Sequence, residues 1–280
     1  MRLLEATVDR DCDIVLHGDT HEGTKTAHTK AVDKVLRWVM AKPNRYYVHM
    51  GDEIEAIVTD DKRFDSDCNE EPKPLRQMHS VRRRYEASKD RCLCWLNGNH
   101  SNKLARFGNL TEELCSQLEV PYGTWTCKLQ LVDPDGNKMM KLFLTHGFRG
   151  TISSNAKDEL QRQANMKARL KLLLERKASD CILMACGHTH KLMVVPPSQK
   201  LLLRDDGTQM IQEYLGQGDG TADYIEQDRR WYCNTGSFMR LYELGVDSYA
   251  EIAGYNPTEM GYCVAKIRNG VLSDIERVVV

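Results

Sequence analysis

Short, nearly continuous apolar runs recur along the chain, and each is followed by glycine or threonine and a polar side chain. Runs of this kind are typical of strands buried on both faces. Glycine at the end of a run lets the backbone turn sharply and approach a ligand. The five runs cover residues 13–17, 46–50, 92–96, 142–144 and 181–186.

Two segments between these runs have the apolar spacing of amphipathic helices. Residues 26–42 carry Ala31, Val35, Trp38 and Val39 at helical spacing. Residues 156–177 are expected to place Leu160, Ala164, Leu170 and Leu174 on one apolar face, with charges elsewhere. Alternating strands and helices indicate an α/β core.

Three further segments have the pattern of β-hairpins. Residues 129–144 turn at 134–137, residues 201–215 turn at 205–207, and residues 262–280 turn at Asn269-Gly270. Asp-Gly and Asn-Gly between alternating residues are strong hairpin signals. Antiparallel strands therefore join the parallel ones, and the sheets are expected to be mixed.

Two charged or glycine-rich segments interrupt this alternation. Residues 59–90 are highly charged, with a Pro-rich breaker at 70–74 before a helical stretch, and are interpreted as an insertion that shapes specificity. Residues 216–230 are interpreted as a flexible loop near the mouth of the site. Without an internal repeat or a clear linker, we expect one domain over residues 1–280.

Composition and charge exclude several classes of protein. The 280 residues carry a net charge of -1, so the overall charge favours neither nucleic acid nor a membrane. No apolar run approaches the roughly 18 residues of a membrane span, and the amino terminus does not resemble a signal peptide. The ten cysteines are scattered and form no CxxC pair, and many scattered thiols without a secretion signal favour a cytoplasmic location with reduced thiols.

The polar residues after the apolar runs are rich in metal-binding types. In open α/β sheets, ligands bind beyond the carboxyl ends of the strands, so these residues should share one sheet edge. In extended chain, residues two apart project to the same side, and so Asp19 and His21 can grip one ion together. The alternative is that the polar side chains only cap strand ends. The residues are Asp19, His21, Asp52, Asn99, His100, His146, His188 and His190.

Other polar residues have a plainer interpretation. His17 and His49 lie inside apolar runs and are expected in the core or behind the ligands, whereas His28 and His79 are expected at the surface. The consecutive Arg82, Arg83 and Arg84 could contact a nucleic-acid backbone, or could be a solvated helix face.

In these motifs the chain resembles the calcineurin-like metallophosphoesterase superfamily. That family has Asp-x-His, Gly-Asp, Gly-Asn-His, a single His and Gly-His-x-His in this order. The resemblance spans about residues 13–240 and implies a four-layer α/β/β/α sandwich with two mixed β-sheets. The matching pieces are Asp19-Thr20-His21, Gly51-Asp52, Gly98-Asn99-His100, His146, Gly187-His188-Thr189-His190 and Asn234-Thr235-Gly236-Ser237.

The resemblance also implies two divalent metal ions and their ligands. One ion would be held by Asp19, His21, Asp52 and His190, and the other by Asp52, Asn99, His146 and His188. This donor set suits Mn²⁺ first, with Fe, Zn²⁺ or Ni²⁺ as alternatives. The ions would lie ~3.5–4 Å apart, and a hydroxide between them would attack phosphorus. 

His100 would contact the phosphate and protonate the leaving oxygen. The family usually places an acid directly after this histidine, but here Ser101 follows it. If that acid normally orients the imidazole, His100 must find another partner.

The expected function is therefore phosphoester hydrolysis, with a phosphodiesterase acting on nucleic acid or nucleotides as the first hypothesis. A phosphomonoesterase, including protein phosphatase, and a nucleotide pyrophosphate hydrolase are alternatives. Protein phosphatases of the superfamily carry arginine shortly after Gly-Asp, whereas residues 53–56 here read Glu-Ile-Glu-Ala. An inactive, metal-stabilised binding module is a further alternative, although no ligand of the pattern is missing.

Overall fold

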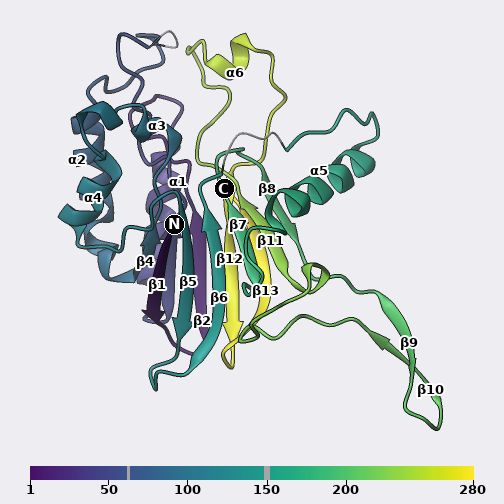
Figure 1. Cartoon of the computed structure of the whole chain (residues 1–280). Helices are drawn as coiled ribbons and strands as arrows, with labels where there is room; N and C mark the ends of the chain where they lie inside the picture. Colours follow the sequence, from purple (N-terminus) through teal and green to yellow (C-terminus); the bar gives the residue numbers. More distant parts are fainter. Residues whose placement is uncertain (62–63, 148–151) are drawn as a thin grey trace.

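Two mixed β-sheets pack face to face in the computed structural model, which describes residues 1–61, 64–147 and 152–280 (Figure 1). The five-stranded sheet has the order β13-β12-β2-β3-β4, and the six-stranded sheet has the order β1-β5-β6-β7-β11-β8. In the first sheet β2, β3 and β4 are parallel, and β12 and β13 are antiparallel neighbours. In the second, β6, β7 and β11 are parallel to one another, β8 is antiparallel to β11, and β5 is antiparallel to β6 but parallel to β1.

Each apolar run and each hairpin of the sequence forms the expected strands. The strands are β1 (Arg2–Thr7), β2 (Cys12–His17), β3 (Arg45–His49), β4 (Cys92–Trp95), β5 (Thr126–Val132), β6 (Lys138–Thr145), β7 (Leu183–Cys186), β8 (Leu192–Val195), β9 (Leu201–Asp205), β10 (Met210–Tyr214), β11 (Trp231–Thr235), β12 (Gly261–Arg268) and β13 (Val271–Val279).

Helices cover the outer faces of both sheets. The α-helices are α1 (Thr29–Met40), α2 (Pro74–Tyr85), α3 (Asn99–Asn102), α4 (Leu110–Leu118), α5 (Glu159–Leu174) and α6 (Tyr249–Ile252), and the 3-10 turns are η1 (Glu86–Arg91), η2 (Ala105–Phe107) and η3 (Gln227–Arg229).

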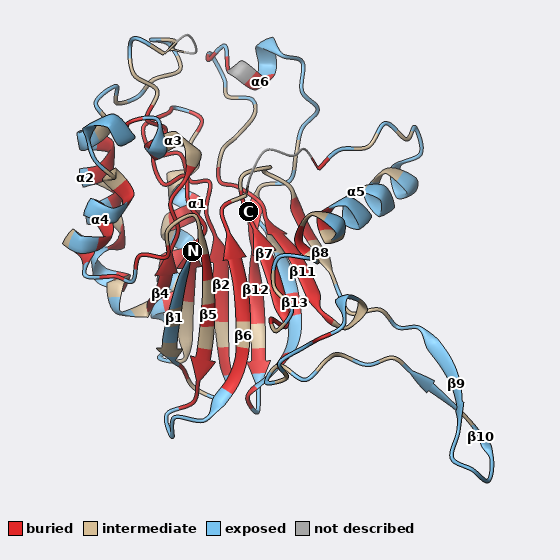
Figure 2. Ribbon diagram, in the orientation of Figure 1, coloured by how far each residue is buried: buried red, intermediate tan, exposed pale blue. Residues whose placement is uncertain are grey.

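Three buried clusters define the four layers. One cluster fills the space between the two sheets and includes Ile14, Leu129 and Leu144. A second joins the five-stranded sheet to α1, α2 and α4, and a third joins the six-stranded sheet to α5. In Figure 2 the buried residues, drawn in red, lie mainly along the strands of the two sheets. The α/β/β/α sandwich expected from the sequence is therefore present.

Only the carboxyl-terminal half of the apolar face predicted for α5 is buried. Leu170 and Leu174 are buried against the sheet, but Leu160 is 78% exposed and Ala164 is also exposed. The amino-terminal half of α5 extends past the edge of the sheet (Figure 2), so its apolar side chains have nothing to pack against.

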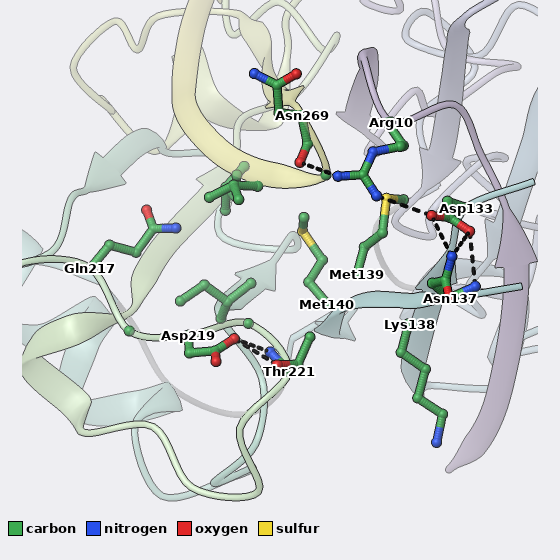
Figure 3. A pocket seen from close by; sticks show the side chains of 16 residues that line it. Arg10, Asp133, Asn137, Lys138, Met139, Met140, Gln217, Asp219, Thr221 and Asn269 are labelled. Atoms are coloured by element: carbon green, nitrogen blue, oxygen red, sulfur yellow. Dashed lines mark hydrogen bonds and ion pairs between the residues drawn. The ribbon is translucent and has the colours of Figure 1, made fainter. Parts of the chain in front are cut away.

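The location expected for residues 216–230 is wrong. This segment lies at the end of the sandwich opposite the strand exits, where it lines a cavity of about 340 Å³ with the turns after β5 and β12 (Figure 3). Arg10 in this cavity is already bonded to Asp133 and to the carbonyl of Asn269. The cavity contains none of the candidate metal-binding residues.

Within the described residues, no helix has the length and apolar character needed to cross a membrane.

Candidate metal centre

Five strand ends from both sheets deliver the candidate ligands to one place. Asp19 and His21 follow β2, Asp52 follows β3, Asn99 opens α3 after β4, His146 follows β6, and His188 and His190 follow β7. The segments after β2 and β3 are joined by backbone bonds: Asp19 N donates to Gly51 O at 2.9 Å, and His21 N donates to Asp52 O at 3.1 Å. These loops are therefore fixed relative to one another.

Several of these residues have a left-handed backbone conformation. Asp19, His21, Asp52, His188 and His190 have φ between 48° and 67°. Positive φ is uncommon for residues other than glycine, costs about 1–3 kcal/mol each, and persists where the surrounding structure imposes it. Such residues concentrate at ligand-binding sites. The backbone strain thus coincides with the positions selected from the sequence.

The first group of donors consists of Asp19, His21 and His190. Nε2 of His190 lies 3.2 Å from Oδ1 of Asp19 and 3.2 Å from Nε2 of His21. Donor atoms that bind one cation at about 2.1 Å lie about 3 Å apart. Asp19 is fully buried, and within the described residues its Oδ1 has no hydrogen-bond partner beyond the contact with Nε2 of His190. A buried carboxylate oxygen without a further hydrogen bond is suited to be a ligand of a cation. The donors Asp19, His21 and His190 are therefore suited to bind a metal ion.

The second group consists of Asp52, Asn99, His146 and His188. Nε2 of His146 lies 3.2 Å from Oδ2 of Asp52 and 3.0 Å from Oδ1 of Asn99. The donor atoms of Asp52, His146 and His188 all lie within 4.8 Å of one another. Asp52 also groups with His21 and His100 within the same limit, so it stands between the two groups. Each group takes donors from both sheets.

In His21 and His146, the ring nitrogen that faces away from the two donor groups has a defined hydrogen-bond partner. Nδ1 of His146 lies 2.8 Å from the carbonyl oxygen of Met50, and Nδ1 of His21 lies 2.8 Å from Oε2 of Glu55. A carbonyl oxygen only accepts, so the His146 proton sits on Nδ1 and leaves Nε2 for a ligand role. Outer partners of this kind orient metal-binding histidines.

His100 is oriented by the segment after Asp52. Its Nδ1 lies 2.6 Å from the backbone oxygen of Glu55, and its backbone N donates to Oδ1 of Asp52 at 2.9 Å. The Ser101 hydroxyl is buried and contacts Asn97 and Thr111 instead. Glu55 is thus a site residue that the sequence analysis missed. Acidic residues alternating with Ile54 and Ala56 in a buried stretch were the available signal.

Other residues hold the metal-site loops from behind. Nδ2 of Asn234 donates to Oγ1 of Thr189 at 2.6 Å and fixes the loop that carries His188 and His190. In the 59–90 segment, Arg84 bonds Glu22, and Gln77 accepts from Ala56 N at 2.9 Å. Helix α2 therefore supports the loops after β2 and β3. Lys62 and Arg63 of this segment lie outside the described residues.

The remaining histidines lie where the sequence suggested or close to it. His17 and His49 are fully buried, and the His49 ring stacks on Trp95 with centroids 4.0 Å apart. Burial lowers the pKa of His17 to about 3, so this ring is neutral. His79 is exposed, whereas His28 is half-buried beside Arg240.

The electrostatics of the site balance carboxylates against imidazoles. Burial disfavours charge on His21, but the Glu55 carboxylate and the nearby Asp52 and Asp19 raise its pKa to about 9. Burial likewise opposes charge on His146, while Asp52 raises its pKa to about 9. Burial would raise the pKa of Asp52, but the surrounding histidines hold it well below its ordinary value.

Metal binding should therefore release protons. His21 and His146, with a pKa of about 9, carry a second proton on Nε2 at pH 7, and each must lose this proton to bind a cation, so affinity should rise with pH towards 9. Calorimetric titration with Mn²⁺ at pH 7, in buffers of different ionisation enthalpy, should give release of about two protons. His146→Gln should lower this number by about one, and the exposed His79→Gln should not change it. A heat independent of the buffer would contradict this assignment.

Fold and site together define an α/β sandwich with a candidate metal centre built across two sheets. No family model matches this chain, and no curated protein matches its sequence.

Solved structures that it resembles include metallophosphoesterases. A predicted phosphoesterase from Streptococcus pneumoniae is 11% identical, with a TM-score of 0.37 over 96% of this chain and 90% of that chain. A metallophosphoesterase from Sphaerobacter thermophilus is 14% identical, with a TM-score of 0.34 over 96% and 88%. Vps29 complexed with Zn²⁺ from Entamoeba histolytica is 12% identical, with a TM-score of 0.35 over 95% and 98%.

Proposed function

We propose that this protein is a metal-dependent phosphoester hydrolase that uses two cations. We propose phosphodiesters of nucleic acid or nucleotides as its substrates. The observation that carries the proposal is the position of Asp52 between two groups of buried donors. Asp19, His21 and His190 would hold one cation, Asn99, His146 and His188 the other, and Asp52 would bridge them. Mn²⁺ suits this mixed donor set first.

The cations, when bound, would supply a hydroxide nucleophile and neutralise charge on the phosphoryl oxygens. The chain itself would hold the donors in place and supply a proton donor. His100 stands beside Asn99 and Asp52, with Nδ1 bound to Glu55 O, which leaves Nε2 to contact the phosphate and its leaving oxygen. All ten cysteines are free thiols, which suits the proposed cytoplasmic location.

The choice between diester and monoester is tested with two chromogenic substrates. With Mn²⁺ added, the protein is expected to hydrolyse bis-p-nitrophenyl phosphate with a kcat/KM about tenfold or more above that for p-nitrophenyl phosphate. A reversed preference would replace the phosphodiesterase with the phosphomonoesterase. Turnover of neither substrate would favour the inactive binding module.

Binding to nucleic acid is proposed to involve the exposed part of helix α2. Arg84 is held by Glu22 and Asp33 inside the molecule, whereas Arg82 and Arg83 are exposed. Arg82 also lies 3.6 Å from Glu86. The proposed contact is therefore narrowed from three arginines to Arg82 and Arg83.

A salt titration checks this contact. If both arginines contact phosphates, log Kd for single-stranded DNA should rise linearly with log salt, and Arg82→Gln with Arg83→Gln should reduce the slope by about 1.4. Fluorescence anisotropy of a labelled oligonucleotide measures it, and the exposed Lys167→Gln on α5 is the control. An unchanged slope would remove α2 from the binding surface.

A further inference from the structure

We propose that the β9-β10 hairpin is a dimerisation arm, whose free β10 edge pairs antiparallel with the same edge of a second copy of this chain. The two strands form a sheet of their own, and within the described residues no other strand pairs with them. Figure 1 shows the hairpin projecting away from the sandwich. This contact surface is independent of the proposed hydrolysis.

Apolar side chains are exposed along both strands of the hairpin (Figure 2). Leu201, Leu202 and Leu203 are 53%, 45% and 65% exposed, and Met210 and Tyr214 are both 67% exposed. A hairpin of two strands without further packing is only marginally stable in water. The turn at 205–209 is exposed and carries two aspartates, which are costly to place in a lipid bilayer. The hairpin is therefore suited to a protein partner.

The hydrogen bonds within the hairpin show which backbone groups of β10 face outward. Leu215 N donates to Lys200 O at 2.8 Å, and Asp206 N donates to Gln209 O at 3.2 Å. In the observed register, hydrogen-bonded and non-hydrogen-bonded pairs alternate between these two ends. The residues of β10 whose N–H and C=O groups point away from β9 are therefore Met210, Gln212 and Tyr214.

This outward edge of β10 is complementary to itself. In an antiparallel pair centred on Gln212, the outward groups of Gln212 meet those of Gln212 in the second copy, and Met210 meets Tyr214. Every outward N–H then faces an outward C=O, as in a regular antiparallel sheet. A glutamine amide both donates and accepts, so the two facing Gln212 side chains can bond each other. An aliphatic side chain opposite an aromatic one stabilises a strand pair.

The charges of the hairpin favour β10 over β9 as the paired edge. Glu213 is the only charged residue of β10, and its Oε1 lies 2.8 Å from Nε of Arg204. In the dimer it would lie opposite Ile211 of the second copy, so no like charges would face each other. A pair of β9 edges would place Asp205 opposite Leu201. Free edges that must stay unpaired commonly carry lysine or proline, and β10 has neither.

The size and place of the contact predict a reversible dimer with open sites. Two strands of five residues offer less than the ~800 Å² per partner of a standard interface, so we expect a dissociation constant in the micromolar range. The hairpin follows β8, which is antiparallel to β11 and β7 and so ends away from the strand exits. The candidate metal centre is therefore at the opposite end of the sandwich and stays accessible.

Sedimentation velocity of the full chain tests the dimer. Between about 1 and 100 µM, the mass should rise from 32.1 kDa towards twice this value. Met210→Arg with Tyr214→Arg should raise the dissociation constant about tenfold or more, because the introduced arginines would face each other across the pair. Leu244→Arg is the control, since Leu244 is 98% exposed but lies outside the hairpin, and it should associate like the wild type. A wild type that stays monomeric, or an arginine variant that dimerises unchanged, would overturn the proposal.

Charge complementation tests the register of the pair. Met210→Glu with Tyr214→Glu should also be monomeric alone, but a mixture with the arginine variant should dimerise, because each arginine would then lie opposite a glutamate. Circular dichroism spectra like that of the wild type establish that both variants are folded. Folded variants that do not associate when mixed would overturn the β10 pairing. Cosedimentation of monomeric wild type with phosphatidylcholine vesicles, lost in the arginine variant, would assign the hairpin to lipid and also overturn it.

Discussion

Replacing Asp52 with asparagine is expected to reduce hydrolysis of bis-p-nitrophenyl phosphate by on the order of 10³-fold or more. Asp52 is almost fully buried and lies between the two donor groups, with His146 on one side and His21 and His100 on the other. The amide has nearly the same shape but loses the negative charge that would be shared by two cations. Both ions should therefore bind more weakly, and the loss should exceed that from a change at either group alone.

Steady-state kinetics with Mn²⁺ and metal analysis of the purified variants measure this effect. Asp133→Asn is the matched control, because Asp133 is also a buried carboxylate but lies in the turn at the opposite end of the sandwich. Its kcat/KM should stay within about twofold of the wild type. Equal turnover by Asp52→Asn would show that the observed hydrolysis comes from a contaminant or from another site.

Gly98→Ala is expected to disrupt the same centre through sterics alone. A Cβ at position 98 would lie 2.1 Å from Oδ1 and 2.2 Å from the backbone N of Asp52. Backbone atoms cannot move aside as a flexible side chain can, so the segment carrying Asp52 must shift. We expect loss of about 100-fold or more in kcat/KM, because misplacement by about 1 Å is enough for such an effect. Overpacking should also lower the free energy of unfolding by about 1–3 kcal/mol or more.

Thermal unfolding and kinetics of the purified variant check both parts. Gly216→Ala is the control, since a Cβ there would meet no atom of the described residues within 4 Å and the residue has no positive φ. It should match the wild type in both measurements. Wild-type activity in Gly98→Ala would mean that the loop after β4 does not hold Asp52 as described.

The sequence predicted those features that depend on local pattern. Asp-Gly and Asn-Gly turns predicted the hairpins β5-β6, β9-β10 and β12-β13, because turn chemistry acts within a few residues. The sequence also predicted that the residues after these strands share one edge of the sheet, since parallel strands align their carboxyl ends. The convergence of Asp19, Asp52 and His146 then followed from the fold class.

Features that depend on distant contacts were missed or misplaced. The exposure of Leu160 follows from where the sheet ends, and helical spacing does not contain that information. Residues 216–230 were misplaced because glycine-rich composition does not indicate which end of a sheet a loop covers. Glu55 was missed because its two histidine partners are 34 and 45 residues away in the chain.

The distribution of donors over two sheets has a mechanical consequence. Asp19 and His21 belong to the five-stranded sheet and His190 to the six-stranded one, and the second group is divided in the same way. A bound cation would therefore act as a cross-link over the apolar interface, tying together layers that otherwise adhere by side-chain packing. Its binding free energy would oppose sliding or parting of the sheets, and the resistance of the whole sandwich to heat would rise with free metal concentration.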